Sequence, residues 1–160
     1  MVPETVISIG EYCFQVDGIG TLYYNATEAA DIQSVYGAPF VGAAIGNLVI
    51  GENVRVIPTQ IFRQTGFSQE ELVLFVETIG TNAFSYAEFK TLTIADGVKY
   101  LYGDAFESAD IQQLNYCSNA ESVESTSSSG VFHSADIYAL NIGENVTMLA
   151  DSVCVILSAF

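Results

Sequence analysis

The chain has 160 residues, half of them hydrophobic, and a formal net charge of −15 from 19 acidic side chains against four lysines and arginines. This length suits one domain with a continuous core. No apolar run reaches the ~18 residues that span a bilayer, so we expect no membrane insertion. Nor do we expect a nucleic-acid partner, because that binding depends on lysine and arginine neutralising phosphates.

One aromatic position recurs along the chain at gaps of 22 or 26 residues. Its members are Phe14, Phe40, Phe62, Phe84, Phe106, Phe132 and, as the non-aromatic exception, Cys154. Self-similarity at a period of 20–50 residues is typical of a solenoid, in which one repeat cannot bury its apolar face alone. The spacing predicts a repeat solenoid of about seven repeats forming a single domain over 1–160, as a piece of a longer array.

Each repeat contains a short segment in which two large apolar residues flank one other residue. In chain order these segments are 22–24, 48–50, 72–74, 92–94, 114–116 and 140–142. The period of two predicts short strands whose first and third side chains face the core. In the third repeat the pattern comes two residues late, because Glu70 stands where the other repeats have leucine and Leu72 follows it. The pair Glu70 and Glu71 is therefore expected in a solvated turn.

Small residues three positions after the recurring aromatic predict tight turns or short helical and 3-10 turns beside it. The two longer repeats carry insertions at 25–31 and 124–130, the second of them rich in serine. Insertions in a solenoid lie in loops on one face, so both are expected to leave the stack intact.

Three hexamers, at 57–62, 79–84 and 9–14, resemble the I-G-x-x-A-F core of BspA-like leucine-rich repeats. The segments 48–54, 140–146 and 2–10 resemble the strand-turn half of the same repeat. The resemblance covers essentially the whole chain. It implies a right-handed leucine-rich-repeat β-solenoid, in a family associated with cell-surface and secreted proteins that bind host or matrix molecules.

The middle residue of each strand segment is expected to face solvent and to offer a partner a binding face. The candidate contact residues are Tyr23, Val49, Val73, Phe75, Thr93, Asn115 and Asn141. The first four would form an apolar and aromatic patch, and the last two a polar half. Exposed apolar patches tend to mark interaction sites, and tyrosine is enriched at binding hot spots. The alternative is that these are ordinary strand residues with high β-propensity.

No catalytic, cofactor or metal site is predicted. The single histidine, His133, lies beside Ser134 and Asp136, but nucleophilic catalysis also needs an oriented base and an oxyanion hole, which the spacing does not indicate. A calcium loop usually carries alternating aspartates, and the chain has no such run. We therefore expect a protein that is not an enzyme and has no cofactor.

The three cysteines, Cys13, Cys117 and Cys154, are expected to be free thiols. Cys13 and Cys154 fall in columns predicted to be buried, at opposite ends of the stack. If each repeat advances by about 5 Å, as strand spacing requires, the two are too far apart for a disulfide.

The sequence predicts a non-enzymatic binding or adhesion module that contacts a protein or glycan through its sheet face, outside the cell or on its surface. Met1 leads straight into a repeat with no visible secretory signal, which leaves a cytoplasmic location open. The alternative function is an intracellular acidic inhibitor or charge mimic that binds a basic partner. The apolar segment 153–160 is no polar cap, so end-to-end self-association is a further hypothesis.

Overall fold

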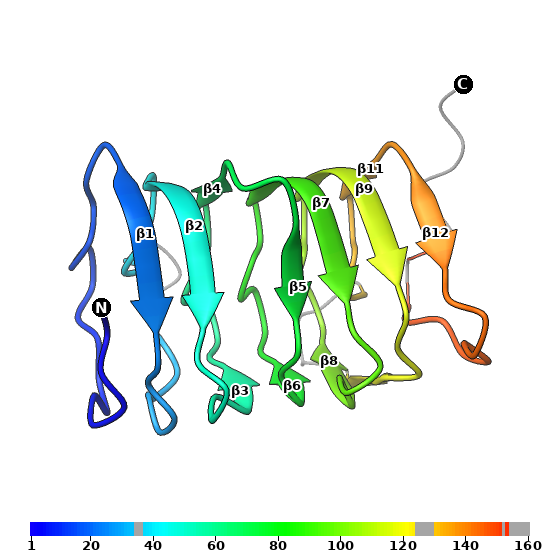
Figure 1. Cartoon of the computed structure of the whole chain (residues 1–160), viewed down its shortest axis with the longest axis horizontal. Helices are drawn as coiled ribbons and strands as arrows, with labels where there is room; N and C mark the ends of the chain where they lie inside the picture. The colour runs from blue at the N-terminus through cyan, green and yellow to red at the C-terminus, as the bar shows by residue number, and fades with distance from the viewer. Residues whose placement is uncertain (34–36, 124–129, 152, 154–160) are drawn as a thin grey trace.

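The computed structural model describes residues 1–33, 37–123, 130–151 and 153, and in them the chain winds as a parallel β-solenoid (Figure 1). One continuous apolar core runs from Val2 to Val153. The predicted repeat solenoid is confirmed. Of the recurring aromatic positions, those from Phe14 to Phe132 lie in the described part and Cys154 lies outside it.

The larger sheet carries the predicted strand segments. Its strands are β1 (Ile19–Tyr24), β2 (Ala44–Ile50), β4 (Gly66–Phe67), β5 (Leu72–Leu74), β7 (Glu88–Ile94), β9 (Asp110–Tyr116), β11 (Asp136–Ile137) and β12 (Leu140–Ile142). They run parallel in the order β1-β2-β4-β7-β9-β11, with β5 paired to β7 and β12 paired to β9. Equivalent residues of successive repeats lie opposite each other, as in Leu22↔Leu48 and Leu92↔Leu114, so the leucine column is buried as far as Leu114, and Leu140 is partly buried.

A smaller parallel sheet forms a second side of the coil (Figure 1). It consists of β3 (Val56–Ile57), β6 (Thr78–Ile79), β8 (Tyr100–Tyr102) and β10 (Glu121–Val123), in the order β10-β8-β6-β3. Ile57, Ile79 and Leu101 point from this sheet into the core and are fully buried.

The recurring phenylalanines form a ladder of rings through the core. Five of them, from Phe40 to Phe132, are fully buried. Ring centroids of neighbours lie 4.6 Å apart for Phe14 and Phe40 and 5.4 Å apart for Phe84 and Phe106. A second stack, Phe67 on Phe89 at 5.1 Å, meets the first edge-on. Such stacked and edge-to-face pairs add to the stabilisation that area burial alone provides.

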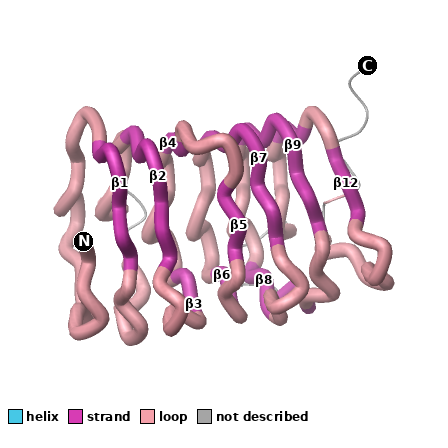
Figure 2. The backbone as a smooth tube through the Cα atoms, viewed as in Figure 1, coloured by secondary structure: helices cyan, strands magenta, loops and turns pink. Residues whose placement is uncertain are grey.

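The turns around the phenylalanine ladder differ from the expectation of short helical or 3-10 turns. No helix occurs in the described residues (Figure 2). The turn regions are instead chains of overlapping β-turns. From Phe62 to Phe132, a left-handed residue stands two positions before and two positions after each phenylalanine, whereas Phe14 has one only before it and Phe40 only after it. Around Phe62 these are Gln60, with φ 61°, and Gln64, with φ 56°. Type II turns require a positive φ at their third residue.

Backbone hydrogen bonding explains why the turn region is not helical. Phe62 N–H donates to Ala83 O in the next coil at 2.9 Å, and Gln64 N–H donates to Ser85 O at 2.8 Å. The intervening Arg63 N–H instead closes a turn on Gln60 O at 3.2 Å. A helix would use its N–H groups within one coil. The alternating pattern satisfies the buried backbone and joins neighbouring coils at the same time.

The two ends of the stack depart from the predicted columns. Cys13 is exposed rather than buried, and Phe14 is only half-buried, because in the described part the first coil is covered on one side only. Ile142, at the far end, is likewise exposed. Most of insertion 124–130 and of the apolar segment 153–160 lies outside the described residues, so the predicted loop and the self-association hypothesis are not addressed by them.

Replacement of Phe84 by alanine is expected to lower the free energy of unfolding by about 3–5 kcal/mol, because a fully buried ring leaves a cavity. Chemical denaturation of the purified variant measures this loss. Phe75→Ala is the matched control, since Phe75 is 73% exposed and its loss should change stability by less than about 0.5 kcal/mol. Equal losses for the two variants would contradict the assigned burial.

Tyr24 and Tyr116 occupy equivalent places in the repeat, but only one of their hydroxyls has a partner. Tyr116 Oη accepts the Ala150 N–H at 3.3 Å. The equivalent position two coils after Tyr24 is Pro58, and proline has no N–H to donate. Tyr24 Oη therefore has no hydrogen-bond partner among the described residues. Burial raises the pKa of Tyr24 to about 12.

Replacing Tyr24 by phenylalanine is expected to raise the free energy of unfolding by about 1 kcal/mol, because it removes an unsatisfied buried hydroxyl. An unfolded tyrosine titrates near pH 10, so between pH 10 and 12 the unfolded state loses this proton first. Stability of the wild type should fall over that range more steeply than stability of the variant. Denaturation at pH 8 and pH 11 measures both effects, and a variant less stable at pH 8 would show that the hydroxyl is satisfied.

Candidate functional site

The predicted contact residues lie on the outer face of the larger sheet, but the structure divides them into two groups. Tyr23 and Val49 lie opposite each other on β1 and β2 and are about half exposed. On the other side of the face, Val73, Thr93 and Asn115 lie in register on β5, β7 and β9, and Asn141 follows on β12. Phe75, just after β5, is the most exposed of the set.

The polar half of the face is largely engaged with itself. Asn115 Nδ2 donates to Thr93 Oγ1 at 3.0 Å, and Asn141 Nδ2 donates to Asn115 Oδ1 at 3.0 Å. Thr93 Oγ1 donates in turn to Glu71 Oε1. This ladder follows from the parallel register, which places the equivalent position of each repeat beside that of the next. Its hydrogen-bonding groups already have partners, so the apolar half is the stronger candidate for ligand contact.

The apolar half is interrupted by a split in the sheet between β2 and β5. Each other neighbouring pair of central strand segments is joined: β1 with β2, β5 with β7, β7 with β9, and β9 with β12. Within the described residues no strand pairing links β2 to β5, and Figure 1 shows these two farther apart than β5 and β7. The coils are joined above the split, where β4 pairs with β2.

The split follows from the two-residue shift in the third repeat. The second, fourth and sixth repeats end their strand in a four-residue turn, such as Ala95–Val98, closed by Val98 N–H donating to Ala95 O at 3.1 Å. The third repeat has two extra residues before β5 and lacks two after it, so Val76 directly follows Phe75. Phe75 thus takes the place of a turn residue, which accounts for its exposed side chain.

Gln69 closes one end of the split. In a regular coil such as that of β9, Leu114 N–H donates to the backbone carbonyl of Ala139 in the next coil at 2.8 Å. The equivalent Leu48 N–H donates to the Gln69 side-chain Oε1 at 2.5 Å, and Gln69 Nε2 donates to Glu71 O at 2.9 Å. A side-chain amide therefore replaces the backbone acceptor that the shift removes.

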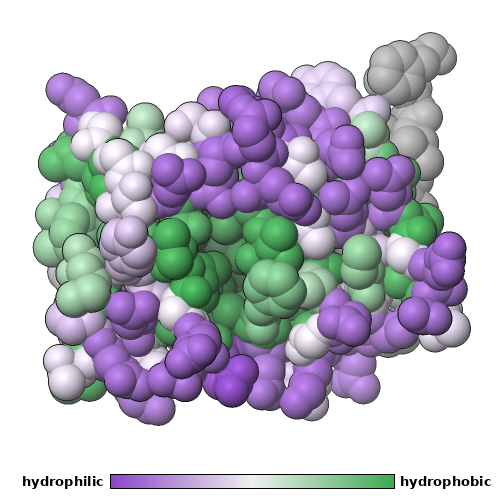
Figure 3. All heavy atoms as spheres, in the orientation of Figure 1, coloured by the Kyte–Doolittle hydropathy of each residue, from purple (hydrophilic) through white to green (hydrophobic). Residues whose placement is uncertain are grey.

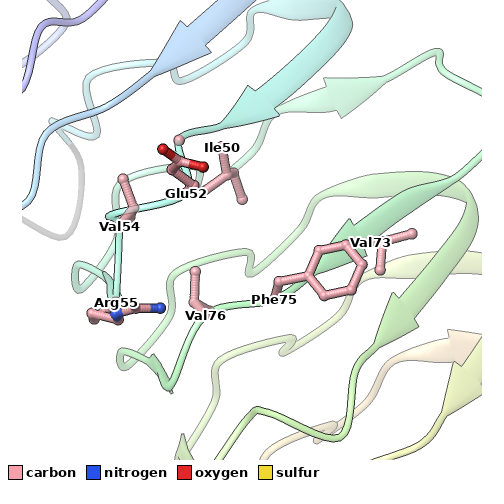
Figure 4. A pocket seen from close by; sticks show the side chains of 8 residues that line it. Ile50, Glu52, Val54, Arg55, Val73, Phe75 and Val76 are labelled. Atoms are coloured by element: carbon pink, nitrogen blue, oxygen red, sulfur yellow. The ribbon is translucent and has the colours of Figure 1, made fainter.

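The split forms an apolar hollow of about 420 Å³ in the middle of the face. Figure 3 shows it as a hydrophobic depression surrounded mainly by polar residues. Its lining comprises Ile50, Gly51, Glu52, Val54, Arg55, Val73, Phe75 and Val76. In the close view, the Phe75 ring lies next to Val73, and Glu52 and Arg55 supply the charged groups (Figure 4). Concave, mostly apolar sites with few polar groups are typical of ligand sites.

The residues around the hollow were only partly foreseen from the sequence. Val73 and Phe75 were predicted as contact residues, whereas Ile50 was expected to face the core. The late position of Leu72 was the available signal. Glu70 and Glu71 are indeed exposed, but the shift also opens the sheet, which a reading of one repeat at a time does not reveal.

The basic residues are mostly engaged with nearby groups. Lys99 Nζ lies 2.9 Å from Glu77 Oε2, and Arg55 Nε lies 3.8 Å from Glu77 Oε1. The hydrogen bond from Lys99 and the nearby positive charges lower the pKa of Glu77. Lys90 pairs with Glu70, and the Arg63 guanidinium lies 5.1 Å from the centre of the Tyr86 ring. The excess of acidic side chains therefore dominates the surface.

The histidine considered for catalysis lies at the surface of the sixth coil. Ser134 Oγ is 3.4 Å from His133 Nε2, and Asp136 begins β11 with an exposed side chain. No hydrogen bond joins His133 to Asp136 in the described part of the chain. The same residues hold no group of three or more histidine, cysteine or acidic side chains that could bind a metal ion. Nor do they include a helix with the length and apolarity of a bilayer crossing.

Replacement of Gln69 by alanine is expected to lower the free energy of unfolding by about 1 kcal/mol, since Leu48 N–H loses its acceptor. Amide hydrogen exchange at Leu48 should accelerate more than exchange at Leu22, which remains in the β1–β2 pairing. Gln113→Ala is the matched control, because the Gln113 side chain bonds to Asn115 and, among the residues that the structure describes, to no backbone group. Unchanged exchange at Leu48 would show that Gln69 does not close the split.

Comparison with known proteins identifies the repeat. A family model described as "BspA type Leucine rich repeat region (6 copies)" matches residues 1–108 and 33–154. No curated protein and no solved structure matches the chain significantly.

Proposed function

We propose, from the premise that this chain belongs to the BspA-type leucine-rich-repeat family, that it is a binding module of a secreted or cell-surface protein. Leucine-rich-repeat solenoids are typically non-catalytic scaffolds for protein interaction. The module contacts a protein or glycan ligand through the outer face of its larger sheet. The contact centres on the apolar half, formed by Tyr23, Val49, Val73 and Phe75, with Thr93, Asn115 and Asn141 at its polar side.

The observation that carries this proposal is the exposure of large apolar side chains around a hollow that mainly polar residues surround on this face. Phe75 is exposed to solvent, and Tyr23 and Val49 present about half of their surface. Contiguous exposed apolar area is uncommon on soluble monomers away from interaction sites. A solenoid also presents its sheet as a rigid, extended face, which suits a macromolecular ligand.

One observation favours a second candidate function, an acidic inhibitor or charge mimic of a basic partner. Lys90, Lys99 and Arg55 each lie within ion-pair distance of a carboxylate, so most of the 19 acidic groups have no cation to offset them. The two candidates differ in salt dependence, because attraction between exposed charges is screened at high ionic strength, whereas apolar contact is not.

Binding of the chain to a panel of purified extracellular proteins and to a glycan array tests the proposal. The double variant Tyr23→Ala, Val49→Thr should weaken binding to any ligand found at least tenfold, because both side chains leave the contact face. Tyr100→Ala is the matched control, since Tyr100 is similarly exposed but lies on β8 in the other sheet. The affinity of the wild type should change little between low and high salt.

Two results would count against the sheet-face proposal. One is binding that the double variant leaves intact. The other is binding that falls steeply as salt rises, which supports the charge-mimic function instead.

A further inference from the structure

We propose that the split between β2 and β5 receives an extended peptide segment of a partner protein, which pairs with the sheet as an added strand. The proposal rests on the function proposed above and specifies the partner class. The segment is short, carries apolar side chains at alternate positions, and is flanked by basic residues.

The backbone at the split is arranged for strand pairing. Residues of a parallel strand turn their N–H and C=O groups alternately to the two neighbours. Because Gly51 N–H donates back to Tyr24 O on β1, the groups of Ile50 point toward β5. By the same alternation, Ala95 N–H donating to Leu74 O places the groups of Val73 and Phe75 toward β2. Two unpaired strand edges therefore face each other, and unpaired edges are templates for an incoming strand.

The position and the ends of the split limit what fits there. A strand paired on both sides needs about 9.6 Å between its neighbours, twice the ~4.8 Å spacing of a sheet. Gln69 occupies one end of the split through its bond to Leu48 N–H. Glu52 and Arg55 lie at the opposite end. An inserted segment thus pairs over a few residues only, which favours a short extended peptide over a helix or a folded domain.

The lining of the hollow specifies alternating apolar side chains. Ile50, Val54 and Val76 form its inner wall, and Val73 and Phe75 form the outer part beside β5. Successive side chains of a strand point to opposite faces. One set of peptide side chains would contact the inner wall, and the other set would lie level with Val49 and Phe75. Added strands gain affinity from backbone bonds and specificity from pockets for alternate side chains.

The charges around the split specify basic flanks. Glu52, Glu70 and Glu71 are exposed beside it, although Glu70 already pairs with Lys90 and Glu71 accepts a hydrogen bond from Thr93. The basic group at the hollow, Arg55, is already close to Glu77. A lysine or arginine beyond each end of the apolar stretch would therefore meet carboxylates, whereas an acidic flank would be repelled.

The peptide fluoresceinyl-Lys-Val-Thr-Val-Thr-Val-Lys-amide is the direct probe, with binding followed by fluorescence anisotropy. Two control peptides isolate the two parts of the recognition. N-methylation of alternate backbone amides keeps the side chains but removes strand hydrogen bonds, and should weaken binding at least tenfold. Replacement of both lysines by aspartate should weaken binding about tenfold at low salt.

A register-restored variant of the protein removes the site without removing its apolar side chains. It deletes Glu70 and Glu71 and inserts Asp-Gly between Phe75 and Val76, copying the turn at Asp96–Gly97. The repeat stays at 22 residues, so β5 should pair with β2 and peptide binding should fall at least tenfold. Phe75→Ala, which removes an exposed side chain, should weaken binding about fivefold and keeps the proposal testable if the first variant does not fold.

The outcomes separate this proposal from the proposed function. Peptide binding that survives N-methylation, or that survives in a folded register-restored variant, overturns strand insertion. So does absence of peptide binding to the wild type. If the Tyr23 and Val49 variant still loses its protein or glycan ligand in those cases, the sheet-face function stands without strand insertion. The proposal is supported if the unmodified peptide binds the wild-type protein and if binding weakens as stated for both control peptides and both protein variants.

Discussion

The structure depends on the requirement that every coil satisfy its backbone through its neighbours. At the phenylalanine ladder, alternate N–H groups bond to the next coil and the others close β-turns. From Phe62 to Phe132 this pattern comes with left-handed residues on both sides of each phenylalanine. It also fixes the rise between coils, so that successive rings stack at 5.0–5.4 Å from Phe40 onward. The rise between successive coils thus determines both the stacking of the aromatic rings and the backbone hydrogen bonds between coils.

At the split between β2 and β5, the backbone hydrogen bonds of the coils are satisfied in another way. The third coil keeps the turns around Phe62 and the Phe62 ring in register with the next coil, as the Phe62–Phe84 distance of 5.4 Å shows. Its strand, however, is displaced by two residues along the chain. On one side β5 pairs normally with β7. On the other side a glutamine amide takes the first hydrogen bond, and the remaining edge is left to solvent or to a ligand.

Much of this fold could be predicted from the sequence, because period-two segments and a recurring phenylalanine determine which side chains are buried. The outward column from Tyr23 to Asn141 could be found in the same way. The turn conformation could not, since residues as different as Gln60, Asn82 and Asp104 adopt positive φ there; the coil-to-coil bonding imposes it. The hollow was also missed, because it arises between two repeats and depends on how their strands are spaced. Cys13 is exposed because, in the described part of the chain, its coil is covered on one side only.

A repeating surface has a difficulty that an irregular one lacks. Because the backbone of the coils repeats, a ligand that contacts only the backbone of the regular sheet meets several equivalent sites, each one coil away from the next. The shift in the third repeat breaks this translational symmetry once in the described array. The sheet face therefore has one distinct site, and a molecule bound there has one register and one orientation.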